Sequence, residues 1–262
     1  MSEAAAQIEA LLQLCAQLRD PRNGCPWDRA QTLATIAPHT IEEAYEVADA
    51  IATADPARIR DELGDLLFQV LLHTQLASEQ DWFNFADVAA GLHDKLVRRH
   101  PHVFGGTAAR DAEALAHDWE SHKTAERAAA GLGGALAGVP KALPALIRAA
   151  KLGRRAAGVG FDWPDEQAVR PKISEELRET EAAVLANDSA AIAEELGDTL
   201  FALVNWARLL RVDPEAALRG ANEKFERRFA AMEALIAARG LSATELTAEG
   251  WEQLWTAAKA AE

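Results

Sequence analysis

Two stretches of the sequence, RDELGDLLF at 60–68 and AEELGDTLF at 193–201, are nearly the same and decide how the chain is organised. In each stretch, two acidic side chains three positions apart are followed by a run of apolar residues. This run is apolar around most of a helix's circumference, which indicates a helix that neighbouring elements bury. A phrase of this kind that occurs twice in one chain predicts a duplicated fold.

Other segments repeat together with this phrase. IEEAYEV at 41–47 matches SEELRET at 174–180, and HDKLVRR at 93–99 matches NEKFERR at 222–228. Between the two copies, the glycine-rich segment GLGGALAGVP at 131–140 interrupts the helical pattern. The repeats therefore predict two domains joined by a linker. The predicted bounds are 1–130 for the first domain, 131–140 for the linker and 141–262 for the second domain.

The composition favours helices over strands, because Ala and Leu are abundant and β-branched residues are scarce. We therefore predict an all-α fold of two tandem helical bundles with four to five helices each. Asn84 and Asp213 stand where helix N-caps belong, and Pro214 suits a first helical turn. In the first domain, helices are expected near 3–19, 39–53, 56–79 and 84–98, another is expected to begin at Asp111, and a loop is expected at 20–28.

The chain of 262 residues is acidic, with a formal net charge of −14 at pH 7. Because this charge repels phosphate backbones and anionic membranes, neither a nucleic acid nor a membrane is expected as a partner. The two cysteines, Cys15 and Cys25, fit no zinc pattern and are too few for a disulfide framework. No signal peptide and no apolar run of membrane-spanning length is evident, so we expect a soluble cytoplasmic protein.

Carboxylates recur at matched positions on two neighbouring helices of each copy. They are Glu43, Glu46, Glu62 and Asp65 in the first copy and Glu176, Glu179, Glu195 and Asp198 in the second. The two carboxylates on each helix are three residues apart and share a face. Four converging carboxylates stay ionised only around a cation, and oxygen-only ligation favours Mg²⁺ or Mn²⁺.

Two other interpretations of these carboxylates compete with a metal site. A solvated acidic face is the better explanation of IEEAYEV taken alone, but it suits the nearly apolar ELGD helices less well. A di-iron bundle requires Glu-x-x-His, and no Glu of this sequence has a His three residues later.

Basic and aromatic side chains also recur at matched positions. They are Lys95, Arg99 and Trp119 in the first copy and Lys224, Arg228 and Trp255 in the second. A Lys and an Arg four residues apart share a helix face that can bind phosphate oxygens, and a Trp ring can stack on a nucleobase. Surface ion pairs and core packing are the competing explanations. With a metal, these groups describe a nucleoside polyphosphate site, although neither GxxxxGK[ST] nor GxGxxG occurs.

The sequence resembles the MazG nucleoside triphosphate pyrophosphohydrolases over essentially its whole length. The motifs that support the resemblance are CPWD at 25–28, EExxE at 42–46, ELGDLLF at 62–68, RRHPHVFG at 98–105 and GFDW at 160–163. The resemblance implies an all-α homodimer that hydrolyses nucleoside triphosphates to monophosphate and pyrophosphate with Mg²⁺. It also implies housecleaning of canonical or aberrant nucleotides and a link to alarmone levels under stress.

The resemblance also implies roles for individual residues. The implied metal ligands are Glu176, Glu179, Glu195 and Asp198, with Glu43, Glu46, Glu62 and Asp65 as their counterparts. Glu175 is implied to assist catalysis in the second copy, and Glu42 in the first. The implied nucleotide contacts are Lys224, Arg228 and Trp255.

The sequence leaves open which copy is active, because both acidic sets are intact. The agreement of NEKFERRF at 222–229 with the family's nucleotide-binding phrase favours the second domain as the main catalyst. An alternative function is a nucleotide-sensing or scaffolding module in which one or both domains are catalytically silent. Such a module would bind nucleotide without releasing pyrophosphate.

Overall fold

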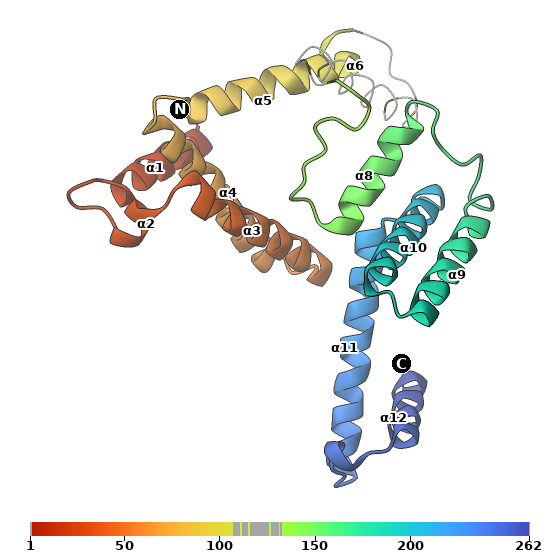
Figure 1. Ribbon diagram of the computed structural model, residues 1–262. Helices are drawn as coiled ribbons and strands as arrows, with labels where there is room; N and C mark the ends of the chain where they lie inside the picture. Colours follow the sequence, from red (N-terminus) through yellow and green to blue (C-terminus); the bar gives the residue numbers. More distant parts are fainter. Residues whose placement is uncertain are drawn as a thin grey trace. The chain divides into compact units, whose positions relative to one another are not determined.

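Helices make up all the regular structure that is described. The computed structural model describes residues 2–106, 111, 115, 126, 131 and 133–261, and every regular element in these residues is helical (Figure 1). The predicted all-α fold is confirmed. The chain divides into two compact units, Met1–His122 and Lys123–Glu262. The bounds predicted for the two domains and for the linker stay predictions.

The first unit begins with a helix close to its predicted position, but its third helix starts earlier than expected. Thr32 forms a capping box with Thr35, so α3 begins at Leu33 instead of near residue 39. Pro38 lies inside α3, where its fixed φ suits a helix and its missing N–H removes one hydrogen bond. The described helices of this unit are α1 (Glu3–Leu18), α2 (Pro26–Ala30), α3 (Leu33–Thr53), α4 (Pro56–Ser78), α5 (Phe85–Arg99) and α6 (Pro101–Phe104).

Side-chain caps begin the next helices along the chain. Asp55 accepts a hydrogen bond from the backbone N–H of Ala57 at the start of α4. Asn84 and Asp87 form a capping box at α5, so the cap predicted at Asn84 is confirmed. The segment 20–28 is not wholly a loop, because α2 begins within it.

Between residues 107 and 132, only single residues are described. The backbone N–H of Leu115 donates to the carbonyl of Asp111 at 3.0 Å, where the sequence predicts a helix to begin. The rest of that predicted helix lies outside the described residues.

A hairpin of α3 and α4 forms the centre of the first unit. Ile36 on α3 packs against Leu72 and Leu76 on α4, and all three side chains are buried. Helix α1 packs on α4, and Arg19 forms a two-point ion pair with Glu79 at 2.6 and 2.7 Å. This packing sets the rotation of α4 and therefore the direction of its polar face.

The second unit repeats the hairpin with α9 and α10. Asn187 takes a left-handed conformation, with φ of 56°, in the connection between them, and Asp188 caps α10. The described helices of this unit are α8 (Ala145–Ala157), α9 (Arg170–Ala186), α10 (Ser189–Leu209), α11 (Pro214–Ala238) and α12 (Ala248–Ala260), with a short 3₁₀ turn at Ala243–Glu245.

Helix α8 approaches α10 closely at one glycine. A Cβ at Gly153 would collide with the amide oxygen of Asn205, which is itself only 1% exposed. Arg208 donates to the same Asn205 oxygen and forms an ion pair with Asp162. The contact thus links α8, α10 and the segment between α8 and α9.

The last two helices pack against each other through their own apolar contact, and α11 also contacts α8 and α10 (Figure 1). Met232 and Ile236 of α11 pack against Leu254 and Ala258 of α12. Asp213 caps α11, and Pro214 is its first residue, as the sequence predicts. No helix in the described part of the chain is long and apolar enough to cross a membrane.

Candidate functional site

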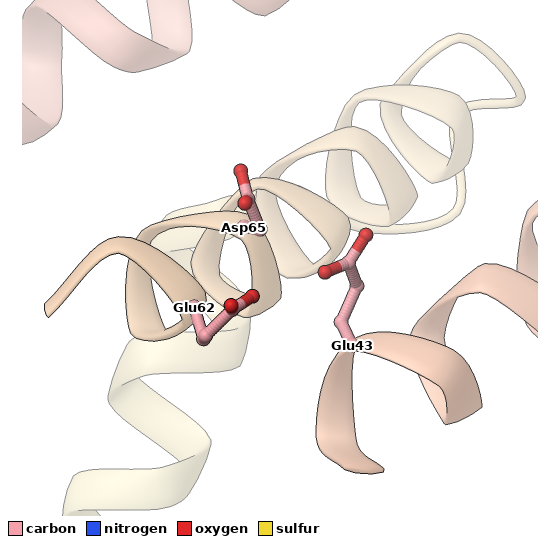
Figure 2. Close-up of side chains that lie close together, drawn as sticks. All are labelled: Glu43, Glu62 and Asp65. Atoms are coloured by element: carbon pink, nitrogen blue, oxygen red, sulfur yellow. The ribbon is translucent and has the colours of Figure 1, made fainter. Parts of the chain in front are cut away.

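The hairpin of α3 and α4 brings three carboxylates together in the first unit. Glu43 extends from α3 toward Glu62 and Asp65 on α4 (Figure 2). One carboxylate oxygen from each residue lies within 4.8 Å of the other two. We call these three residues the first acidic cluster. Glu46, the fourth predicted ligand, is exposed and lies outside this closest group.

Repulsion within the first acidic cluster changes the acidity of Glu43. Partial burial raises the pKa of Glu43 above its ordinary value, and the carboxylates of Asp65, Glu46 and Glu42 raise it further. Glu46 therefore lies near enough to act on Glu43. A cation among these oxygens would relieve the repulsion.

The hairpin of α9 and α10 repeats the arrangement in the second unit. Glu176 and Glu179 on α9 and Glu195 on α10 each place a carboxylate oxygen within 4.8 Å of the others, and they form the second acidic cluster. Partial burial, followed by the carboxylates of Glu179 and Glu176, raises the pKa of Glu195. Asp198 raises this pKa as well, although it lies outside the closest group.

The second acidic cluster has a cationic neighbour that the sequence reasoning missed. Lys172 Nζ lies 2.7 Å from a carboxylate oxygen of Glu176 and 3.0 Å from one of Glu175. These carboxylates raise the pKa of Lys172 well above its usual range. The signal in the sequence was the four-residue spacing of Lys172 and Glu176, which places them on one helix face. In the first unit, His39 takes the corresponding place, 3.4 Å from Glu42.

Both clusters fit a hard divalent cation. Their donors are carboxylate oxygens, the ligand type that Mg²⁺ and Mn²⁺ prefer. Burial and then neighbouring carboxylates raise the pKa values of Glu43 and Glu195, and a cation bound at either cluster would offset both effects. The chemistry of the donors therefore agrees with the metal site that the sequence predicts.

Basic and aromatic side chains of the second unit meet where α11 packs against α12. Arg228 Cζ lies 5.4 Å from the centre of the Trp255 ring, which is a cation–π distance. The centre of the Phe225 ring lies 5.7 Å from that of Trp255. Lys224 is exposed one turn before Arg228 on α11. These residues lie on a different helix pair from the carboxylates of the second acidic cluster.

The corresponding group of the first unit is described only in part. Lys95 and Arg99 lie one turn apart on α5, and both are partly buried. Trp119 lies outside the described residues, so its role stays a prediction.

Comparison with known proteins identifies the family. The MazG nucleotide pyrophosphohydrolase domain matches residues 31–104 and, a second time, residues 165–231. The chain belongs to the MazG family. The resemblance that the sequence motifs indicate is therefore confirmed, and MazG proteins are hydrolases of phosphoric anhydride bonds.

Full-length relatives support the assignment to MazG. A protein of Escherichia coli K12 named nucleoside triphosphate pyrophosphohydrolase is 50% identical over 255 residues, which cover 97% of each chain. A Thermotoga maritima protein named nucleoside triphosphate pyrophosphohydrolase/pyrophosphatase MazG is 41% identical over 259 residues, covering 99% of this chain and 98% of the relative.

Each of the two MazG segments contains one of the two acidic clusters. The first segment contains α3, α4 and α5, and the second contains α9, α10 and most of α11. Each MazG segment therefore includes one complete carboxylate hairpin and the basic helix that follows it. The roles predicted for single residues in these segments stay predictions.

Proposed function

We propose that this MazG protein hydrolyses nucleoside triphosphates to nucleoside monophosphate and pyrophosphate, using Mg²⁺ or Mn²⁺. The proposal rests on one observation. Each MazG segment contains three carboxylates, and one oxygen from each lies within 4.8 Å of an oxygen of the other two. The names of the full-length relatives agree with this activity.

The proposed metal ligands are the two acidic clusters together with Glu46 and Asp198. A divalent cation bound there would neutralise charge on phosphate oxygens and make a nearby water more acidic. A carboxylate of the site would accept a proton from the water that attacks phosphorus in line with the departing pyrophosphate.

The proposed substrate contacts lie on α11 and α12. Lys224 and Arg228 would bind phosphate oxygens through charge-assisted hydrogen bonds. Trp255 would contact the base with the part of its ring that Arg228 and Phe225 leave free. The Arg228–Trp255 contact supports this assignment, because it keeps a phosphate-binding group beside an aromatic ring. Lys95, Arg99 and Trp119 are the proposed counterparts in the first unit.

The second unit is proposed as the main catalyst. Glu175 is proposed to assist Glu176, and their shared neighbour Lys172 would also be close to bound phosphate. The proposal also includes a homodimer, a cytoplasmic location and a housecleaning role toward canonical or aberrant nucleotides that is coupled to alarmone levels.

A matched pair of variants tests the activity and its location. Pyrophosphate release would be measured from a panel of nucleoside triphosphates for the wild type, Glu62→Gln and Glu195→Gln, which change the same position in the two copies. We expect Glu195→Gln to lose at least about a hundredfold in kcat. Full activity in both variants would refute the assignment of the metal site. If only Glu62→Gln loses pyrophosphate release, the first unit is the main catalyst.

A further inference from the structure

Gln69 is a buried side chain beside the first acidic cluster that the proposed function does not use. It lies on α4 one turn after Asp65 and is only 6% exposed. Its amide nitrogen donates to a carboxylate oxygen of Glu43 at 3.5 Å. Its carbonyl oxygen is buried and has no hydrogen-bond partner among the described residues. The amide nitrogen therefore contacts the cluster, while the carbonyl oxygen of the same amide group is buried and unpaired.

The fold by itself does not explain this amide. Leaving a buried carbonyl oxygen without a partner destabilises a protein. The matching position of the second hairpin is Ala202, which is equally buried, at 4% exposure. An apolar side chain is therefore compatible with this position of the duplicated helix, and the first copy has a polar one at a cost in stability.

The two clusters also differ in how their negative charge is balanced. In the second cluster, the Lys172 ammonium already lies 2.7 Å from Glu176. Among the described residues, no Lys or Arg forms an ion pair with the carboxylates of the first cluster. The corresponding His39 contacts Glu42, which is not one of its three members. The first cluster thus has an uncharged amide beside it and no paired ammonium, whereas the second has a paired ammonium and Ala202 at the position that matches Gln69.

We propose that Gln69 is a metal-positioning residue that makes the first acidic cluster a divalent-cation site occupied without nucleotide. The amide orients Glu43 through its N–H group and offers its carbonyl oxygen, a normal ligand for hard cations, either to the ion or to its hydration shell. The second cluster, already paired with Lys172, binds a cation weakly until nucleotide phosphates supply further oxygens. This inference rests on the proposed function, because both assign divalent cations to the clusters.

The difference between the first and second acidic clusters predicts one tight and one weak cation site in the nucleotide-free protein. Mn²⁺ would be titrated into the full chain and followed by calorimetry and by the electron paramagnetic resonance signal of free Mn²⁺. The titration would be repeated in a Glu195→Gln background, in which the second cluster is weakened. We expect one tight site per chain to remain in that background.

Substitutions at position 69 test the role of the amide. Gln69→Leu in the same background is expected to weaken Mn²⁺ binding by about tenfold or more. Its melting temperature in chelator is expected to be no lower than that of the background, because leucine removes the unpaired oxygen. Gln69→Glu retains an oxygen and is expected to retain binding. Gln75→Leu, on the same helix but directed to Glu79, is the matched control and is expected to bind as the background does.

Each outcome decides the inference. Unchanged Mn²⁺ affinity in Gln69→Leu would overturn it, as would a loss of affinity accompanied by an equal loss of stability in chelator. If the wild type releases pyrophosphate but binds no Mn²⁺ without nucleotide, this inference fails and the proposed function stands. If the wild type neither binds Mn²⁺ nor releases pyrophosphate, both fail.

Discussion

At the scale of single residues, the carboxylates of each hairpin work against the stability of the metal-free chain. Glu43 and Glu195 both have raised pKa values, because burial and neighbouring carboxylates favour their protonated forms. Such a glutamate binds a proton more readily in the folded state than in the unfolded state. Its contribution to stability is therefore present at low pH and is lost as the pH rises above the ordinary glutamate pKa of 4.5.

The variant Glu43→Gln tests this pH dependence. In chelator at pH 7, we expect its melting temperature to exceed that of the wild type, because one of three repelling charges is removed. At pH 4 the two proteins should melt at similar temperatures, since Glu43 is then largely protonated in the wild type. Thermal unfolding at both pH values, without and with Mg²⁺, checks the prediction. A variant that is equally destabilised at both pH values would contradict it.

Whereas neighbouring carboxylates repel one another, the Lys172 ammonium attracts the carboxylates of Glu176 and Glu175 and offsets part of their negative charge. Lys172→Met should therefore strengthen Mn²⁺ binding to the second cluster in the absence of nucleotide. Calorimetry in a Glu62→Gln background, which weakens the first cluster, would measure the change. Lys151→Met on α8 is a control for the loss of one positive charge elsewhere in the unit. Weaker Mn²⁺ binding in Lys172→Met would show that the lysine does not compete with a cation.

At the scale of helices, the hairpins place the carboxylates and the contacts around them fix the hairpins. Helix α8 supports α10 through Gly153, which leaves room for the Asn205 amide. The Asn205 amide donates to the carbonyl of Phe201 at 3.1 Å and accepts from Arg208 at 3.2 Å. Since α10 also carries Glu195, this contact helps to set the rotation of the acidic face.

Gly153→Ala should destabilise the second unit by about 1–3 kcal/mol, because the new methyl group overlaps the buried Asn205 side chain. Gly220→Ala is the matched control in α11, where a Cβ would meet no atom within 4 Å. That control should be more stable than the wild type by about 0.5–1 kcal/mol, since alanine favours the helix. Urea unfolding of both variants measures the two effects. A Gly153→Ala variant as stable as the control would mean that α8 shifts freely on α10.

At the scale of the whole molecule, an apolar stripe repeats on the two acidic helices. Its members are Leu63, Leu67 and Val70 on α4 and Leu196, Leu200 and Leu203 on α10. Leu63, Leu196 and Leu200 are each about half exposed, at 49%, 50% and 51%. Exposed apolar residues aligned in this way are typical of a surface that packs against another protein.

We expect a second copy of the chain to cover these stripes in a symmetric dimer, because identical stripes can pair across a two-fold axis. Light scattering after size-exclusion chromatography should give about twice the chain mass of 28.3 kDa. Leu200→Glu should lower the mass toward that of the monomer. The control Leu185→Glu replaces an exposed residue of α9 outside the stripes and should leave the dimer intact. A wild-type monomer would contradict the dimer and would favour pairing of the two stripes within one chain.

Much of this organisation could be predicted from residue spacing, because a helix fixes which side chains share a face. The duplication, the all-α fold, the MazG resemblance and the caps at Asn84 and Asp213 follow from local sequence alone. The sequence predicts this helix only from about residue 39, but α3 starts at Leu33, because the Thr32–Thr35 capping box begins the helix before Pro38. Local chemistry there outweighed the proline.

The sequence by itself determined which carboxylates can face a neighbouring helix, since their three-residue spacing is a property of the helix. Only the tertiary structure decided that Glu46 and Asp198 lie outside the closest groups and that the amide of Gln69 is buried beside Glu43. The physical reason is that convergence depends on how two packed helices are rotated and shifted against each other. That arrangement is set by contacts far from the acidic residues, such as Ile36 with Leu72 and Gly153 with Asn205.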